Sequence, residues 1–137
     1  MKVKGILLAA FILITFASCS LLESPIFKRD EILKSGQIYS DSLNFEVAGT
    51  YSIYISSDYS LDIFFFDARK GYEVFRDSGM LYSEYIYQPL SYANKAYVDE
   101  VFQIFENNKT LYFVIDNRDY VSASDGDALY SIEIKKL

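Results

Sequence analysis

Oxygen-bearing side chains gather near the C-terminal end of the 137-residue chain, and groups of this kind could bind a cation. They are Asp116, Asn117, Asp119, Asp125 and Asp127. Carboxylate and amide oxygens are the ligands of hard cations such as Ca²⁺. Their spacing matches no calcium-binding motif, however, and Ser-Asp-Gly-Asp is typical of turns, where glycine supplies a positive φ. We therefore interpret this loop as a turn and predict no metal site, although the sequence leaves cation binding by residues 116–127 open.

Paired carboxylates could also perform acid–base catalysis, and Glu84, Asp99 and Glu100 are the candidates. A glycosidase needs one acid kept protonated by an apolar pocket and a second carboxylate at a fixed separation. Acidic residues on the polar faces of strands are usually solvated instead. The chain contains no histidine, and its serines stand in no Gly-x-Ser-x-Gly motif. The sequence therefore predicts a noncatalytic protein without a cofactor.

Tyrosines are densest between residues 82 and 97 and could form a binding surface. Five stand there, namely Tyr82, Tyr85, Tyr87, Tyr92 and Tyr97. Tyrosine combines a large contact area with a polar tip, which suits recognition. In a regular strand Tyr85 and Tyr87 share one face and Tyr82 lies on the other, so the five cannot form a single surface. We expect several of them in the core and take Tyr82, Tyr85 and Tyr87 as candidate partner-binding residues.

The first twenty residues have the layout of a secretory signal. Lys2 and Lys4 form a positive region, residues 6–16 form an apolar run, and small residues precede Cys19. The apolar run is shorter than the roughly 20 residues that a helix needs to cross a bilayer. The sequence therefore predicts a cleaved leader rather than a membrane-spanning anchor.

The segment Phe16-Ala17-Ser18-Cys19 resembles the lipobox of bacterial lipoproteins, with Phe16 in place of the commonest leucine. That resemblance implies cleavage before Cys19, acylation of its sulfur, and attachment of the protein to a membrane of the bacterial cell envelope. Ser20 follows the cysteine, whereas an aspartate there would resemble an inner-membrane retention signal. The outer membrane is therefore the preferred location.

This processing divides the chain into a signal peptide of residues 1–18, a lipidated tether of residues 19–30 and one domain of residues 31–137. Two of the thirteen basic residues and none of the nineteen acidic ones precede Cys19, so the mature chain has a formal charge of −8. We predict no nucleic-acid partner, because nucleic-acid binding depends on clustered Lys and Arg. Cys19 is the single cysteine of the sequence, which rules out a disulfide framework.

Short apolar or alternating runs separated by turn residues predict an all-β fold of about eight antiparallel strands. Residues 51–55 alternate between apolar and polar. Residues 61–66 are apolar on both faces, which predicts a strand that is central in its sheet or covered on its outer side. Residues 98–105 have helical and strand spacing at once. Their β-branched and aromatic content favours a strand that forms a hairpin with residues 111–115. The remaining expected strands are 31–34, 43–47, 72–75, 81–87 and 128–134.

Three stretches together resemble the GOLD domain, a family of small β-sandwiches. They are residues 51–65, 111–117 and 129–134, and the last two resemble the closing hairpin of that family. The resemblance covers about residues 31–137. It implies an eight-stranded antiparallel sandwich or jelly roll that contacts other proteins or membranes and performs no catalysis. Gly49-Thr50-Tyr51 also looks like one strand of secreted prepeptidase C-terminal sandwiches, which have a related architecture.

The sequence as a whole predicts an envelope lipoprotein whose β-sandwich is tethered through Cys19 and binds another envelope protein. The alternative is that the sandwich binds a small ligand or a glycan, with tyrosines stacked on sugar rings. An interaction module should expose a contiguous apolar or aromatic patch, whereas a ligand binder should have a concave pocket with convergent polar groups.

Overall fold

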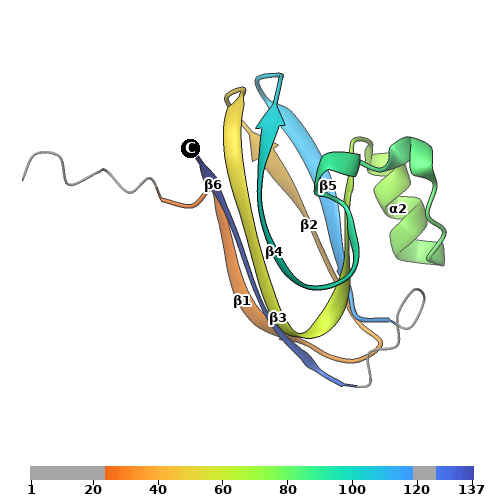
Figure 1. Cartoon of the computed structure of the whole chain (residues 1–137). Coiled ribbons are helices and arrows are strands. Elements are labelled where there is room, and N and C mark those ends of the chain that lie inside the picture. The colour runs from red at the N-terminus through yellow and green to blue at the C-terminus, as the bar shows by residue number, and fades with distance from the viewer. Residues whose placement is uncertain (1–23, 119–125) are drawn as a thin grey trace, which may run out of the picture.

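The computed structural model describes residues 24–118 and 126–137. In these residues the chain forms one antiparallel sheet of six strands with one α-helix and two short 3-10 helices (Figure 1). The strands are β1 (Phe27–Leu33), β2 (Ile38–Phe45), β3 (Gly49–Phe66), β4 (Tyr92–Ile104), β5 (Lys109–Asp116) and β6 (Ala128–Lys136). The helices are α2 (Arg69–Ser78), η1 (Ser83–Tyr85) and η2 (Gln88–Leu90). The predicted all-β class is confirmed.

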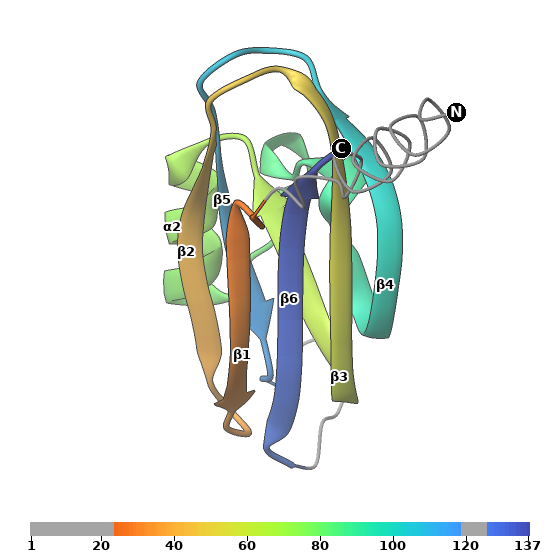
Figure 2. The ribbon, with the colours of Figure 1, turned by 90° about the vertical axis from the view of Figure 1, so that its left-hand side faces the viewer.

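The sheet curls around the long strand β3. The first half of β3 pairs with β6 on one side and β4 on the other, whereas its last five residues, Asp62 to Phe66, pair with β5. Shifts of register between Ser56 and Leu61 mark the bend between the two halves. The strand order is β1-β6-β3-β5-β2, with β4 beside β3, and Figure 2 shows β1, β6 and β3 side by side. The sheet thereby wraps around a core.

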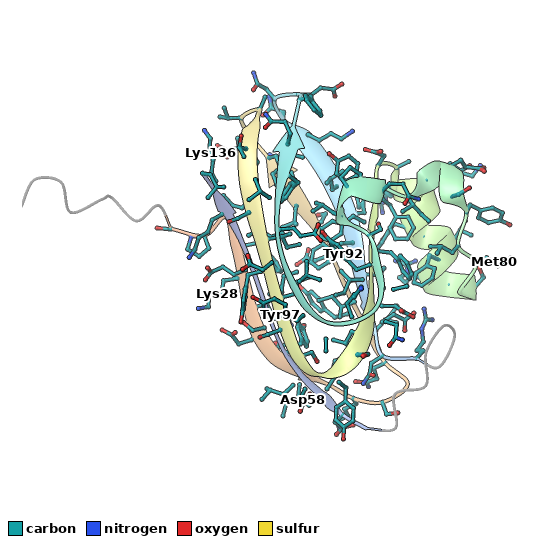
Figure 3. The ribbon with its side chains drawn as sticks, in the orientation of Figure 1. Lys28, Asp58, Met80, Tyr92, Tyr97 and Lys136 are labelled. Carbon is teal, nitrogen blue, oxygen red and sulfur yellow. The ribbon has the colours of Figure 1, made fainter. Side chains whose placement is uncertain are left out.

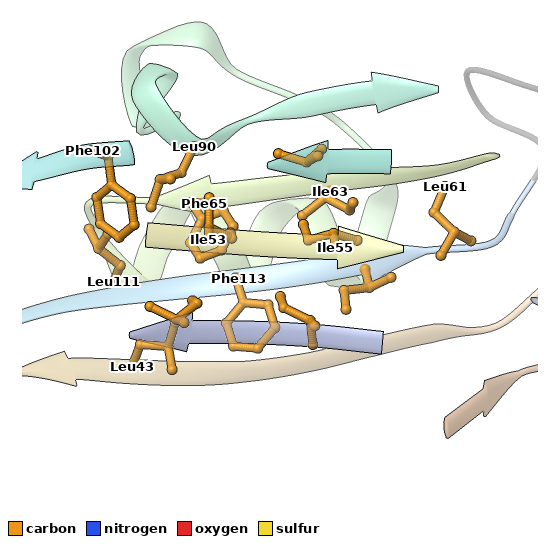
Figure 4. Packing of buried hydrophobic residues seen from close by; sticks show 14 of the residues in the cluster. Leu43, Ile53, Ile55, Leu61, Ile63, Phe65, Leu90, Phe102, Leu111 and Phe113 are labelled. Carbon is orange, nitrogen blue, oxygen red and sulfur yellow. The ribbon is translucent and has the colours of Figure 1, made fainter. Parts of the chain in front are cut away.

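The main core lies inside the curl and follows the predicted alternation. Tyr51, Ile53 and Ile55 are buried, while Ser52 and Tyr54 between them face outward, so the predicted period of two in this strand is confirmed. Phe65 of β3 and Phe113 of β5 are partners in strand register, and their rings stack with centroids 5.3 Å apart (Figure 4).

A second, smaller cluster lies outside the curl, between the sheet and helix α2. Phe64 and Phe66 point away from the main core and pack on Phe75 of the helix, with ring centroids 5.3 and 5.9 Å apart. Val114 of β5 completes this cluster. Residues 61–66 were predicted to form a strand that is central in its sheet or covered on its outer side, and the structure shows the covered outer side.

The strand predicted for residues 72–75 is wrong, because these residues lie in α2. Tyr72 and Phe75 are three residues apart, so a helix places both rings on the face that covers the sheet, whereas a strand would point them to opposite sides. Gly79 ends the helix in the left-handed conformation with φ 71°, and its N–H donates to the carbonyl of Phe75 at 2.8 Å.

The strand predicted for residues 81–87 is also wrong. Tyr85 and Ile86 donate their N–H groups to the carbonyls three residues earlier, which forms η1. One isolated bridge between Ile86 and Phe66 and a 2.7 Å hydrogen bond from the Tyr87 N–H to the Phe65 carbonyl then hold the segment against the end of β3. With residues 51–66 forming one bent strand, the described part of the chain has six strands rather than about eight.

Two hairpins were expected, one between residues 98–105 and 111–115 and one between residues 111–117 and 129–134. Neither pair of strands is hydrogen-bonded to each other in the structure. Strand β4 pairs with β3, β5 pairs with β2 and β3, and β6 pairs with β1 and β3. The loop after β4 instead crosses to the opposite side of the curl, where the Asn108 N–H donates to the carbonyl of Glu46 at 3.1 Å. Strand β1 begins at Phe27, so residues 27–30, predicted to belong to the tether, are part of the sheet.

Candidate functional site

The predicted lipid attachment site, Cys19, lies outside the described residues, as do Asp119 and Asp125 of the acidic loop. Within the described part of the chain, no helix is long and apolar enough to span a membrane. The chain enters the sheet at β1, where the Ile26 N–H donates to the carbonyl of Ile134 at 2.9 Å. The described fold therefore begins at Ile26, seven residues after Cys19 in the sequence.

The three candidate tyrosines do not share one surface. Tyr82 is exposed, and its ring meets that of Tyr85 edge-on with centroids 6.3 Å apart. Tyr85 is half-buried against Gly71 of α2, within the outer cluster. Tyr87 packs on the main core instead, and its hydroxyl donates to the carbonyl of Gln103 at 3.2 Å. Tyr85 and Tyr87 thus pack against the two core clusters, and Tyr82 alone of the three is exposed enough to contact a partner.

Tyr82 belongs to a small exposed segment that follows helix α2. Met80 and Leu81 precede it and are exposed as well, and the Tyr82 hydroxyl lies 3.7 Å from the sulfur of Met80. Figure 3 shows Met80 beyond α2, on the opposite side of the molecule from Lys28 of β1. This segment is one apolar surface that a partner can reach.

Another exposed apolar surface runs along the outer face of β3 and β4 and extends to Phe105, which follows β4. It consists of Tyr54, Tyr97, Val101 and Phe105, which are 40, 59, 63 and 83% exposed, and we call it the β4 stripe. Tyr97 and Tyr54 meet edge-on with ring centroids 5.7 Å apart. In the register of the two strands Tyr54 lies opposite Asp99, so Tyr97 and Val101 are its diagonal neighbours.

Sequence reasoning missed the β4 stripe, although a signal was present. Every second residue from Tyr97 to Phe105 points outward once the segment is taken as a strand. Three of these five outward residues are apolar or aromatic, and the other two are Asp99 and Gln103. An outward row of this composition is unusual, because exposed faces of strands are mostly polar.

The described residues of the acidic loop form hydrogen bonds with other groups of the protein. The Asp116 carboxylate accepts hydrogen bonds from the Arg118 guanidinium at 2.7 and 2.9 Å. The Asn117 amide donates to the carbonyls of Leu33 and Gly126 at 2.9 and 3.0 Å, and Asp127 accepts the N–H of Ser35 at 3.1 Å. In the described ranges no three His, Cys, Asp or Glu residues form a group that could hold a metal ion.

A second buried carboxylate, Asp62, faces Asp116 across β3 and β5. Burial raises the pKa of Asp62, and the charge of Asp116 acts in the same direction. The N–H of Asn94, which donates to the Asp62 carboxylate at 2.7 Å, lowers that pKa and offsets part of the effect. Protonation of Asp62 therefore favours the folded state.

The carboxylates considered for catalysis are all exposed and have separate neighbours. Glu84 lies in η1. Asp99 accepts a hydrogen bond from the hydroxyl of Tyr97 at 3.3 Å, and Glu100 accepts one from the hydroxyl of Tyr92 at 3.0 Å. Burial, together with the Glu100 carboxylate, raises the pKa of Tyr92. None of the three sits in the apolar surroundings that would keep a carboxylic acid protonated.

Fold and surface together define a small all-β protein, built on one curled antiparallel sheet, with an apolar stripe on its outer face. No protein-family model matches this chain, and no curated protein matches it in sequence.

Proposed function

We propose that this protein is a noncatalytic interaction module of the bacterial cell envelope, anchored to a membrane through lipidated Cys19. The outer membrane is the preferred location. The leader of residues 1–18 and its lipobox-like end support the anchor. The β4 stripe supports the interaction, because contiguous exposed apolar patches on soluble domains usually mark surfaces that bind a partner.

The chemistry of the stripe indicates the kind of partner. Tyr97 and Tyr54 supply aromatic rings with polar tips, which are enriched at the centres of protein interfaces. Asp99 stands between Tyr97 and Val101 on the same face, and the mature chain has a formal charge of −8. We therefore expect the partner to be an envelope protein that presents an apolar patch bordered by basic residues.

A crosslinking pull-down from envelope extracts tests this function. The full chain is compared with a stripe variant that carries Tyr97→Ser, Val101→Ser and Phe105→Ser. All three side chains are mostly exposed, so the variant should keep the fold. A matched control carries Met80→Ser, Leu81→Ser and Tyr82→Ser, which remove exposed apolar side chains at the other surface.

We expect one envelope protein to be enriched by the full chain and by the control, and to be lost from the stripe variant. Loss from the control alone would refute the stripe and assign the surface to the segment of Met80, Leu81 and Tyr82. Enrichment of no protein would refute the interaction module. Serine substitutions at Tyr85 and Tyr87 are unsuitable here, because both rings pack in the interior.

The anchor has its own test, the incorporation of labelled palmitate by cells that express the chain or its Cys19→Ser variant. Label in the wild-type chain and none in the variant is the expected result. Label that persists in Cys19→Ser would refute acylation at this sulfur.

We also propose that the curled sheet is a GOLD-like sandwich or jelly roll. The two halves of β3 support this, since they pair with different neighbours and contribute to opposite sides of the core. An experimental structure superposed on GOLD domains tests the proposal, and a different order of strands around β3 would refute it.

A further inference from the structure

A polar groove of about 300 Å³ lies between helix α2 and the edge strand β2, on the opposite side of the sheet from the main core. Arg69, Tyr72 and Arg76 line it from the helix, and Ser40, Asp41, Ser42 and Tyr112 line it from β2 and β5. In strand register Ser42 is directly opposite Tyr112, so the hydroxyl and the ring lie next to each other on the same face. None of these residues belongs to the β4 stripe.

The floor of the groove is aromatic. The rings of Tyr72 and Tyr112 stack with centroids 5.6 Å apart and an angle of 29° between their planes. The Tyr72 hydroxyl donates to Oγ of Ser40 at 3.1 Å, which fixes this ring between helix and strand. Flat aromatic faces bordered by hydroxyl groups are suited to the C–H face and the hydroxyls of a pyranose ring.

Two guanidinium groups flank this floor. Arg69 and Arg76 are seven residues apart, so they lie on the same side of α2 roughly 10 Å apart along its axis, with Tyr72 between them. The guanidinium carbon of Arg76 lies 5.4 Å from the centroid of the Tyr72 ring. The Arg76 guanidinium therefore lies over part of the Tyr72 ring, within reach of the substituents of a sugar that binds beside it.

Both arginines keep donors for a ligand. Nε of Arg69 donates to Glu73 at 2.8 Å, and Arg76 donates to Asp77 at 2.7 and 3.2 Å. These ion pairs are exposed, so they contribute little stability, and a guanidinium has five N–H donors in all. A carboxylate can therefore bind the remaining N–H groups without displacing either partner.

We propose that this groove binds a carboxylated sugar, a hexuronate residue of an acidic polysaccharide. The sugar ring lies on Tyr72 and Tyr112, its carboxylate binds the arginines, and its hydroxyls bind Ser40 and Ser42. A simple anion uses the cations without the aromatic floor, and a neutral sugar uses the floor without the cations. A hexuronate uses both.

Binding to the full chain in detergent micelles tests this proposal, with trigalacturonate as the probe and saturation-transfer NMR and calorimetry as readouts. Its methyl ester keeps the sugar rings and loses the charges, and inorganic phosphate keeps a charge and loses the rings. We expect trigalacturonate to bind with a Kd in about the 0.1–1 mM range, because the site is open to solvent. The ester should bind about tenfold or more weakly, since it forms no charge-assisted hydrogen bonds.

The variant Arg69→Gln/Arg76→Gln should lose about tenfold or more in affinity for the same reason. Lys70→Gln is the matched control, because it removes a positive charge from the same helix outside the groove. It should bind as the wild type does, and circular dichroism checks that both variants are folded. Equal binding of the ester, full competition by phosphate, wild-type affinity of the double variant, or no saturation by trigalacturonate would each overturn the proposal.

Discussion

Helix α2 and the segment after it are packed so closely that glycine is required at position 71. A Cβ atom added to Gly71 would lie 2.2 Å from Cβ of Tyr85 and 2.8 Å from its Cγ. Both atoms are near the backbone of η1, so a rotation of the tyrosine side chain cannot relieve the contact. The substitution Gly71→Ala must therefore displace the helix or η1.

Two effects of opposite sign set the size of the change. Alanine is better than glycine in the interior of a helix by about 1 kcal/mol. Overpacking of an interior costs about 1–3 kcal/mol, and a separation as short as the one at Gly71 belongs to the upper part of that range. We expect Gly71→Ala to lower the free energy of unfolding by about 2 kcal/mol.

Urea-induced unfolding followed by circular dichroism measures this change, and a double-mutant cycle identifies its cause. Tyr85→Gly removes both atoms that the new Cβ would meet, so Gly71→Ala in that background should become stabilising by about 1 kcal/mol, the helix-propensity gain alone. Unchanged or increased stability of the single variant would refute the close packing of α2 on η1. The same loss in both backgrounds would show that Tyr85 is not the obstacle.

Three further substitutions test the interior. Phe75→Ala should cost about 3–5 kcal/mol in urea unfolding, because Phe75 joins α2 to the outer face of β3, and a loss below about 1 kcal/mol would contradict that role. Asn117→Ala should lower the free energy of unfolding by about 1–3 kcal/mol in the same assay, since the carbonyls of Leu33 and Gly126 lose their donor. Wild-type stability of this variant would contradict a structural role for the Asn117 amide. The raised pKa of Asp62 means that the folded state binds the proton of this carboxyl group more tightly than the unfolded state does. The protonated group therefore stabilises the fold below the unfolded pKa of about 4, and this stabilisation is lost as pH rises through the folded pKa. Asp62→Asn should therefore increase stability at pH 7 relative to wild type and flatten the fall above pH 4, and chemical unfolding across pH 4–8 that shows neither change would refute this.

Much of the sheet could be predicted from local patterns. The alternation of residues 51–55 and the doubly apolar run of residues 61–66 report directly which faces are buried, because side chains in a strand alternate between two sides. The errors fall at residues 72–75 and 81–87, where aromatic residues with high strand propensity lie in helical turns. Their conformation follows from the need to cover the cluster of Phe64, Phe66 and Val114, and the contact with Val114 is long-range in sequence.

The candidate sites also depend partly on local sequence patterns and partly on long-range contacts. Tyrosine density indicated a surface near residue 82, but Tyr85 and Tyr87 are held by packing against different clusters. The β4 stripe combines residues of two strands, and the groove combines a helix with β2 and β5. Such combinations depend on strand pairing and on the position of α2, which local spacing does not encode.

The sequence alone determined the all-β class, the faces of the main strands and the negative charge, because each depends on residue type or on a period of a few residues. Processing at Cys19 stays a prediction from the same local pattern. The tertiary structure decided that residues 51–66 form one bent strand and that residues 69–78 form a helix. It also decided that the strands of the expected hairpins pair with other strands of the curled sheet. Long-range pairing and the burial of two apolar faces decide these features, since the free energy of a contact depends on which residues the fold brings together.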